Sequence, residues 1–287
     1  MQTKPGIAMV GAGNLAGALA ASLHRAGYAI EAVTGRSSAE SRRKARRLAR
    51  EVGGRSSASL PKDLRAEVVW ICVPDGEIAH AAESLAKQTK WEKRVALHSS
   101  GALSSDVLGA FRQRGAAVAS VHPLMTFVRG SRPALQGVSF AIEGDAAAVR
   151  VAHRIVKDLG GHGCSIRKRD KAAYHAWGTF VSPLLTALLV ITERVAAAAG
   201  VGPRAAKRRM LPIVRQTVEN YAAGKAADAF SGPIIRGDVD TVRQHLRALR
   251  KVPGARDVYR SLAFAALHYL PGKNKATLAK VLGSEGK

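Results

Sequence analysis

Short apolar runs alternate with longer amphipathic segments through the first half of the chain. The run Ile7–Val10 can be buried on both faces, which is typical of a strand in a parallel sheet. Leu15, Leu19 and Leu23 then recur every four residues and define one face of a helix. Residues 29–34 predict a second strand. The pattern therefore predicts a strand–helix–strand unit at the start of the chain.

The same alternation continues to about residue 166 and then stops. Further strands are predicted at 68–73, 94–97, 118–121, 138–143 and 163–166, with helices at 38–52, 78–87, 104–114 and 145–159. Beyond them only helical patterns remain, at 170–199, 203–223, 239–250 and 256–268, and Pro183 is expected to bend the first of these helices. The sequence thus predicts an α/β Rossmann domain over residues 1–166 and an all-α domain over 167–287.

The first turn has the small residues of a dinucleotide-binding site. Gly11 allows a sharp reversal, Gly13 allows a pyrophosphate to approach the backbone, and Ala16 allows the helix to pack on the strand. Asn14 and Leu15 begin the helix, whose unpaired N–H groups and positive dipole end favour a phosphate. The strand before the turn, the helix after it and the second strand together support this interpretation over a glycine-rich turn without a ligand.

The end of the second strand indicates which dinucleotide is bound. An NAD site usually has an acidic residue there, but this chain reads Thr34-Gly35-Arg36-Ser37. Arg36 can bind a phosphate and Ser37 can donate a hydrogen bond, so the sequence favours NADP(H). Ser37 and Glu40 also fit a capping box at the start of the next helix, and the two roles are compatible.

Later strands bring polar residues to the same sheet edge, where the ligand crevice of such folds lies. Asp75 is expected to cap a helix rather than to take part in chemistry. The residues assigned to the cofactor at these strand ends are Val73, Pro74, Asp75, Ser99 and Ser100.

Two histidines, His98 and His122, follow adjacent predicted strands and are candidates for the active site. Structural roles for both are the alternative. Metal binding is a third option with little support, because no Cys, His or Asp group has ligand spacing and Cys164 near His162 is an isolated pair.

The long helix after residue 170 carries a second group of candidates. Lys171, Tyr174 and His175 lie at i, i+3 and i+4, so they share one face, and each can donate a proton as hydride reaches a carbon atom. A solvated lysine beside two half-buried rings is the alternative. Arg236, in the loop 231–238, either binds a substrate carboxylate or pairs with an acidic residue.

The chain is strongly basic, with 45 Lys and Arg against 21 Asp and Glu and a net charge of +24. The basic clusters at 42–50, 167–171, 204–209 and 243–256 contain no interleaved aromatic residues and no nucleic-acid motif. They are better explained as solvated helix faces than as a nucleic-acid surface.

The cysteine content and the apolar segments indicate a cytoplasmic protein. Only Cys72 and Cys164 are present, so a disulfide framework is not expected. The first residues lead directly into a strand, which predicts no signal peptide. The charge-free run 176–192 has 17 residues that include Gly, Ser, Pro and Thr, which favours a buried helix over a membrane span.

In its ordered motifs the chain resembles a bacterial family of Rossmann-like oxidoreductases with a C-terminal helical domain of unknown function. The resemblance covers residues 6–270 and rests on VGAGNLAGAL, VPDGEI, HSSGAL, HPLMTF, DKAAYHAWGTF and GPIIRGDVDTV. More distantly it is similar to pyrroline-5-carboxylate reductases, deazaflavin-dependent NADP reductases and hydroxyacid dehydrogenases. The resemblance implies a C-terminal domain like that of 6-phosphogluconate dehydrogenase, which forms the homodimer.

The hydroxyacid dehydrogenases suggest roles for particular residues. Their Ser-Gly pair binds the substrate carboxylate and a helix Lys acts as general acid or base, which implies these roles for Ser100-Gly101 and Lys171. Two positions depart from the relatives: His175 replaces an Asn, and Met125 stands where the nearer family has Gln.

The combined hypothesis is an NADP(H)-dependent oxidoreductase acting on a C=O or C=N bond of a small anionic substrate. Lys171 or His175 supplies the proton, His98 and His122 shape the site, and Gly101, Tyr174 and Arg236 contact the substrate. A non-catalytic NADP(H)-binding sensor or scaffold is the alternative. The apolar helix after residue 176 predicts a homodimer.

Overall fold

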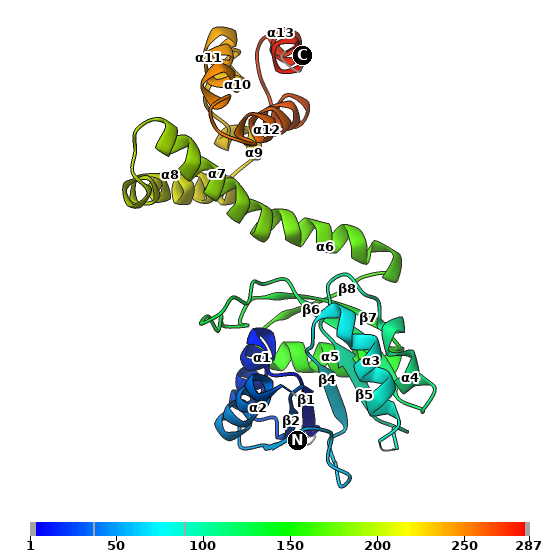
Figure 1. Cartoon of the computed structure of the whole chain (residues 1–287). Helices are drawn as coiled ribbons and strands as arrows, with labels where there is room; N and C mark the ends of the chain where they lie inside the picture. The colour runs from blue at the N-terminus through cyan, green and yellow to red at the C-terminus, as the bar shows by residue number, and fades with distance from the viewer. Residues whose placement is uncertain (1–3, 37, 89, 285–287) are drawn as a thin grey trace. The chain divides into compact units, whose positions relative to one another are not determined.

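The computed structural model describes residues 4–36, 38–88 and 90–284. Contacts divide the chain into two compact units, residues 1–180 and 181–287 (Figure 1). The sheet ends at Ser165, close to the expected boundary near residue 166. Helix α6 (Lys171–Thr179) nevertheless groups with the first unit, because Lys171 is buried there and bonded to two of its serines.

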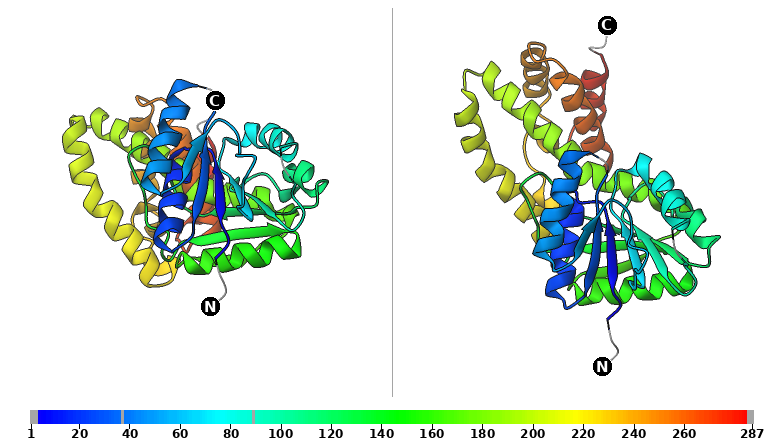
Figure 2. Two further views of the ribbon diagram at one scale, coloured as in Figure 1. Left: turned by 90° about the horizontal axis from the view of Figure 1, so that it is seen from below. Right: turned by 60° about the horizontal axis from the view of Figure 1, so that its bottom comes forward.

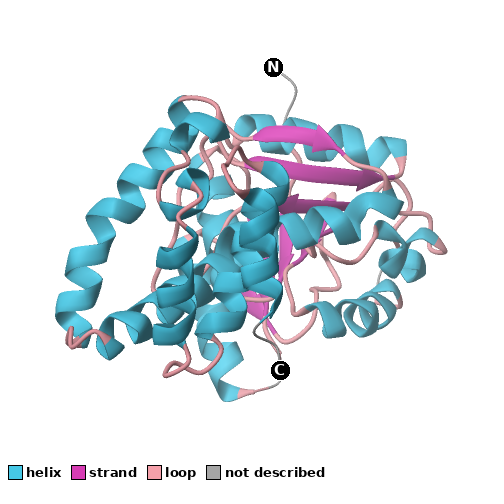
Figure 3. Ribbon diagram, turned by 90° about the horizontal axis from the view of Figure 1, so that it is seen from above, coloured by secondary structure: helices cyan, strands magenta, loops and turns pink. Residues whose placement is uncertain are grey.

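The first unit contains an eight-stranded sheet, whose strands are drawn in magenta in Figure 3. Their order is β3-β2-β1-β4-β5-β6-β7-β8, and the pairs are parallel except β6 with β7. The strands are β1 (Ile7–Val10), β2 (Ile30–Thr34), β3 (Arg55–Ser57), β4 (Val68–Ile71), β5 (Val95–His98), β6 (Ala117–Pro123), β7 (Ser139–Gly144) and β8 (His162–Ser165). The edge strand β3 is polar and largely exposed, and hydropathy therefore did not predict it.

Helices cover both faces of this sheet. Alternate residues of β1 and β4 face two separate apolar clusters, as expected for strands buried on both sides. One cluster includes α1 (Asn14–Arg25), α2 (Ala39–Glu51) and α5 (Ala146–Asp158). The other includes α3 (Asp75–Ala86), η1 (Ser105–Leu108) and α4 (Gly109–Arg112). Both views in Figure 2 show α1 and α2, in blue, together on one side of the strands.

The strand register places the candidate residues at one edge. Val10 pairs with both Thr34 and Ile71, Ile71 pairs with His98, and His98 pairs with Ser120. The loops that follow these positions therefore leave the sheet on the same side.

The chain enters its second unit through η3 (Phe180–Leu184), a π-helical turn that contains Pro183. The sequence predicted a bend at Pro183, and the structure has the π-helical turn at that position, since proline cannot supply the regular helix hydrogen bond. The helices that follow are α7 (Leu185–Ala198), α8 (Pro203–Ala223), α9 (Ala226–Ala229), α10 (Pro233–Arg236), α11 (Val239–Leu249), α12 (Ala255–Tyr269) and α13 (Lys275–Ser284). An apolar cluster centred on Val242, Leu246 and Leu278 joins α11, α12 and α13.

The sequence did not predict three features of this unit, one of which is the short helix α9. The GPIIRG segment, expected to be a loop, forms the short helix α10 between Gly232 and Gly237, whose φ angles are 100° and 74°. A further helix, α13, lies beyond the last predicted one.

The expectation that the long apolar helix is buried is wrong for the chain taken singly. The helical stretch Lys168–Ala198 is long and apolar enough to cross a membrane by length and composition alone, and none of its most apolar window is buried. Helix α7 has no buried residue, and α8 has only Ala206. The chain's own elements cover these two helices only in part, with Ile191 and Val195 of α7 packed against Leu249, Val252 and Ala255.

Candidate functional site

The turn between β1 and α1 has the geometry that a dinucleotide site requires. Gly11 has a φ of 107°, and its N–H donates to the Thr34 carbonyl at 2.9 Å. A Cβ at Gly11 would lie 2.3 Å from the carbonyl oxygen of Cys72, so only glycine fits. A Cβ at Gly13 would meet nothing within 4 Å, whereas Ala16 is fully buried. Gly11 thus forms the reversal, Gly13 leaves space for a ligand beside the backbone, and Ala16 packs the helix on the strand.

The start of α1 is available to an anion. Gly13 is the N-cap residue and has no side chain to cap the first turn, so the first N–H groups face the open space above it. Asn14 does not cap them either, because its amide donates to the carbonyl of Phe127 at 3.2 Å. Leu15 is partly buried against the core.

Arg36 lies just beyond the end of β2, as predicted, with an exposed side chain. Its backbone N–H donates to the Ser41 hydroxyl at 2.7 Å. Ser37 lies outside the described residues. The predicted Ser37–Glu40 capping box is wrong for α2, since the N-cap is Ser38, whose hydroxyl accepts from Ser41 N–H at 3.2 Å.

Asp75 is not a helix cap. It is the first residue of α3, after Pro74 as N-cap, and makes no side-chain cap bond. Its carboxylate instead accepts a hydrogen bond of 2.7 Å from the Ser100 hydroxyl. Pro74 occupies the N-cap position, which its fixed φ suits. The Asp75 carboxylate therefore does not cap the helix and instead binds the loop that follows β5. Val73 precedes Pro74 at this edge and is partly buried.

Ser100 has all its polar groups engaged inside the protein. The hydroxyl donates to Asp75 and accepts from the N–H groups of Ala102 and Leu103 at 3.2 and 3.0 Å. Its carbonyl accepts from Lys171 Nζ at 3.2 Å and from the Ser120 hydroxyl at 3.3 Å. These bonds fix the loop at Ser100, so this side chain positions the site rather than offering a free donor.

His98 is fully buried and both of its ring nitrogens are used. Nδ1 accepts from the backbone N–H of Ser100 at 3.1 Å, so Nε2 donates to the Ser104 carbonyl at 3.2 Å. Burial, reinforced by the charge of Lys171, lowers the pKa of His98 to about 3. This geometry favours a structural role. Ser99 is similarly engaged, since its hydroxyl accepts from the Trp70 indole at 2.8 Å.

Lys171 is only 2% exposed, although the helix pattern was also compatible with a solvated side chain. Its Nζ donates to the Ser120 hydroxyl at 2.7 Å and to the Ser100 carbonyl. Burial lowers the pKa of Lys171, while the negative charges of Glu143 and Asp75 oppose that shift. The ammonium therefore ties α6 to two neighbouring strand ends.

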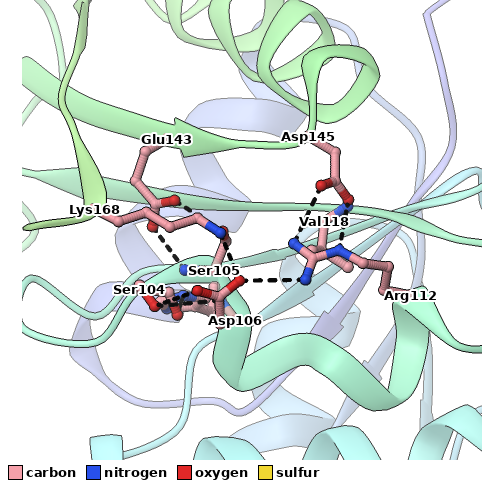
Figure 4. A network of polar contacts seen from close by, with 9 residues as sticks. Ser104, Ser105, Asp106, Arg112, Val118, Glu143, Asp145 and Lys168 are labelled. Atoms are coloured by element: carbon pink, nitrogen blue, oxygen red, sulfur yellow. Dashed lines mark hydrogen bonds and ion pairs between the residues drawn. The ribbon is translucent and has the colours of Figure 1, made fainter.

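Glu143 is the buried acidic partner of this region. Its carboxylate accepts from the backbone N–H and the hydroxyl of Ser105 at 2.6 and 2.8 Å. Figure 4 shows it beside a surface network in which Asp106 binds both Arg112 and Lys168. Arg112 also pairs with Asp145 at 3.1 Å. These contacts fasten η1, and hence the loop after Gly101, to β7.

A group of rings lies over Gly101. A Cβ there would be 2.5 Å from His122 Nε2 and 2.6 Å from His175 Cδ2, so the absence of a side chain allows both rings to approach. The His122 ring is edge-on to those of Tyr174 and His175, with centroids 5.9 and 6.2 Å away. Trp177 extends the group, 5.6 Å from Tyr174. Four polar or aromatic groups thus meet at the sheet edge.

The protonation states in this ring cluster differ. Burial, with the charges of Lys171 and His175, lowers the pKa of His122 to about 4, so its ring is neutral near pH 7. Within the described part of the protein, His122 Nδ1 is buried without a hydrogen-bond partner. Burial raises the pKa of Tyr174, which keeps the phenol protonated. His175 is exposed on α6.

Arg236 lies in the second unit, where its guanidinium pairs with Asp238 at 2.8 Å. This is the alternative that the sequence left open. Met125 is exposed after β6. Across residues 4–36, 38–88 and 90–284, no group of three or more His, Cys, Asp or Glu side chains is arranged to hold a metal ion.

Sequence reasoning missed two residues that organise the site, Ser120 and Glu143. Each is a polar residue inside an otherwise apolar strand, and both are buried. A polar group at such a position needs an internal partner, which is the signal that could have identified them.

Comparisons with known proteins identify the two domains and the fold of the chain. Residues 1–123 match the family model of a Rossmann-like domain, and residues 138–266 match that of DUF2520, a domain of unknown function. No curated protein matches the chain.

Three solved structures are similar to this chain over nearly its whole length. A candidate NADP oxidoreductase from Bacteroides fragilis has a TM-score of 0.75 and 21% identity, with 91% of this chain and 97% of that one covered. A Thermotoga maritima protein has a TM-score of 0.69 and 24% identity, with 98% and 100% covered. A pyrroline-5-carboxylate reductase from Coxiella burnetii has a TM-score of 0.59 and 15% identity, with 97% and 98% covered. At these identities the similarity establishes the fold.

Proposed function

This chain carries a Rossmann-like domain followed by a DUF2520 domain, and from that premise we propose that it is an NADP(H)-dependent oxidoreductase. The reaction is hydride transfer to or from a C=O or C=N bond of a small, anionic substrate. The observation that carries the proposal is the turn before α1, with its reversal at Gly11, open space at Gly13 and buried Ala16. When bound, the nicotinamide supplies or accepts the hydride, so the protein must position it and move a proton.

The residue that follows β2 favours the phosphorylated cofactor. Arg36 follows β2 and has an exposed side chain, whereas an NAD site usually has an acidic residue there. The net charge of +24 also favours anionic ligands in general. Arg36 would bind the 2′-phosphate and the start of α1 the pyrophosphate.

His175 is the proton donor in this proposal. It is exposed on α6, yet its ring shares the space over Gly101 with His122. The neighbouring Tyr174 phenol stays protonated and can donate a hydrogen bond to a substrate oxygen or nitrogen. His122 is neutral near pH 7 and offers an acceptor to the substrate.

Lys171 acts as a positioning residue rather than as the proton donor. Its side chain is buried and its Nζ is bonded to Ser120 and the Ser100 carbonyl. Through these bonds it holds α6, which carries Tyr174 and His175, against β6 and the loop that contains Gly101.

Calorimetry with NADPH and NADH tests the cofactor assignment. We expect NADPH to bind more tightly, and Arg36→Ala to weaken NADPH by about tenfold or more while leaving NADH unchanged. Arg46→Ala, an exposed arginine on α2, is the matched control. Absence of binding to both nucleotides would contradict the proposal.

Turnover tests the chemistry, with a panel of carboxylate-bearing carbonyl and imine compounds followed by NADPH absorbance. His175→Ala should abolish most turnover, and Tyr174→Phe should lower it less. Lys171→Ala should leave NADPH affinity intact and lower turnover by about 100-fold.

Lys171→Met should also raise the pKa of His122 in an NMR titration, because the lysine charge lowers that pKa. A purely structural lysine far from the ring cluster would not change that pKa.

A non-catalytic NADP(H)-binding sensor is the second candidate. The full engagement of Ser100 and Lys171 in internal bonds favours it, since neither offers a free group to a substrate. Tight NADPH binding without oxidation by any compound of the panel would support this function over the enzyme.

The second unit supplies the homodimer contact in this proposal. Helices α7 and α8 have almost no buried residues, although α7 is mostly apolar. A second copy would cover this surface, and light scattering measures the expected doubling of mass.

A further inference from the structure

A basic pocket lies beside the dinucleotide turn and includes cationic residues that the sequence did not assign to the cofactor. It has a volume of about 320 Å³ and lies between α1, α2 and the loop that joins β6 to β7. Its polar wall is formed by Gly13 and Asn14 at the start of α1. Three cationic side chains line it: Lys44, Arg47 and Arg132.

Arg132 is held over the pocket by contacts on both sides. Its guanidinium lies beside Gly17 of α1, where an added Cβ would be 3.7 Å from its Nε, an ordinary contact distance. Its Nη1 forms an ion pair with Glu51 at the end of α2. The loop that carries Arg132 is also fastened to α1, because the Asn14 amide donates to the Phe127 carbonyl. The arginine is therefore positioned before any ligand arrives.

The pocket has a surplus of positive charge. Lys44 pairs with Glu40 at 2.7 Å and Arg132 with Glu51, but the described residues place no carboxylate in ion-pair contact with Arg47. Neither glutamate lines the pocket. Open cationic side chains and an uncapped helix start together suit an anion with several oxygen atoms.

We propose that Arg47 and Arg132 form the outer half of the cofactor site and bind the pyrophosphate of the dinucleotide. This inference rests on the proposed function. The pyrophosphate is favoured over the 2′-phosphate because the pocket includes Gly13 and Asn14, whereas Arg36 at the end of β2 does not line it. The loop after β6 thus contributes to cofactor affinity from a segment outside the Rossmann motif.

Calorimetry with NADPH, NADH and inorganic pyrophosphate tests this assignment. Arg47→Ala and Arg132→Ala should each weaken NADPH and NADH by the same factor, about tenfold, because both nucleotides carry the pyrophosphate. Arg132→Lys, which keeps the charge, should recover part of the loss. Arg46→Ala on the same helix should bind both nucleotides as the unaltered protein does, and the melting temperature of each variant checks that it is folded.

The remaining outcomes separate this inference from the proposed function. Unchanged affinity in both alanine variants would overturn the inference, and so would a loss restricted to NADPH, which would assign the pocket to the 2′-phosphate. If the unaltered protein binds neither nucleotide, the proposed function fails. In that case, inorganic pyrophosphate that binds to the unaltered protein but not to Arg47→Ala would still support an anion site in this pocket. If inorganic pyrophosphate does not bind to the unaltered protein, the inference is overturned.

Discussion

The two units of this chain differ in how completely they cover their own apolar side chains. In the first unit, helices pack on both faces of the sheet, and β1 and β4 are buried along their whole length. In the second unit, the main apolar cluster joins α11, α12 and α13, while α7 has no buried residue. The first unit has a complete core, and the second leaves a large apolar surface open.

The two units are therefore suited to different roles, the first to holding a site and the second to association. A rigid, fully packed sheet edge holds the turn, Ser100 and the ring cluster in fixed positions, as binding and proton transfer require. The exposed helices of the second unit suit association instead. The stability of the first unit should therefore be independent of protein concentration, whereas that of the second should rise with it.

Charges placed on the exposed helices should give the largest effect. Leu184→Asp with Val190→Asp adds two carboxylates to side chains that are 46% and 49% exposed in the single chain. The proposed dimer should be lost, and light scattering should report one chain of 30.3 kDa instead of two. Val128→Asp, at an exposed valine of the first unit, is the control and should keep the dimer. A dimer that persists in the double variant would show that the second unit is covered in another way.

Gly101→Ala should damage both turnover and stability in the first unit. The added Cβ would meet the rings of His122 and His175 at 2.5 and 2.6 Å, so both must move. We expect turnover to fall by about 100-fold and the free energy of unfolding to fall by about 1–3 kcal/mol. Gly109→Ala, where a Cβ meets nothing within 4 Å, is the control. Unchanged turnover in Gly101→Ala would remove the ring cluster from the chemistry.

The contrast between units also explains what the sequence could predict. Buried parallel strands give continuous apolar runs, so β1, β4 and the helices around them were predicted nearly as they occur, and the Rossmann and DUF2520 matches confirm the expected resemblance. The exposure of α7 was not predictable, because an apolar helix has the same pattern whether its own chain or a partner covers it.

Within the site, local motifs were easier to predict than long-range contacts. The turn at Gly11 follows from neighbouring residues alone. Lys171, by contrast, is bonded to Ser100 and Ser120, which are far from it along the chain, and helix spacing contains no information about such partners. The position of Asp75 beside Ser100 was missed for the same reason.

Acid should destabilise the first unit through His98. Burial holds the pKa of His98 at about 3 in the folded protein, against an ordinary value of 6.5. Below pH 6.5 the unfolded chain binds a proton that the folded protein does not, so the stabilising contribution is complete above that pH and is lost as the pH falls toward 3. The free energy of unfolding should fall by about 1.4 kcal/mol per pH unit for this one group.

Urea unfolding at pH 7, 6 and 5 measures that slope. His98→Gln keeps hydrogen-bonding groups but cannot be protonated, so its slope should be shallower by the contribution of one histidine. His24→Gln, at an exposed histidine near the end of α1, should leave the slope unchanged. Equal slopes for His98→Gln and the unaltered protein would show that another group governs the acid sensitivity.

Gly17→Ala should give the smallest effect, and it should be stabilising. Gly17 lies inside α1 with an ordinary helical backbone, and a Cβ there would lie 3.7 Å from Arg132, an ordinary contact distance. Alanine restricts the unfolded chain, so we expect the free energy of unfolding to rise by about 0.5–1 kcal/mol.

Gly35→Ala is the opposite case. Its Cβ would lie 2.8 Å from the Ser41 carbonyl oxygen, so this variant should destabilise the same unit. Both shifts should be the same at low and high protein concentration. A concentration-dependent shift would mean that the first unit is stabilised by association as well, and the contrast between the two units would no longer hold.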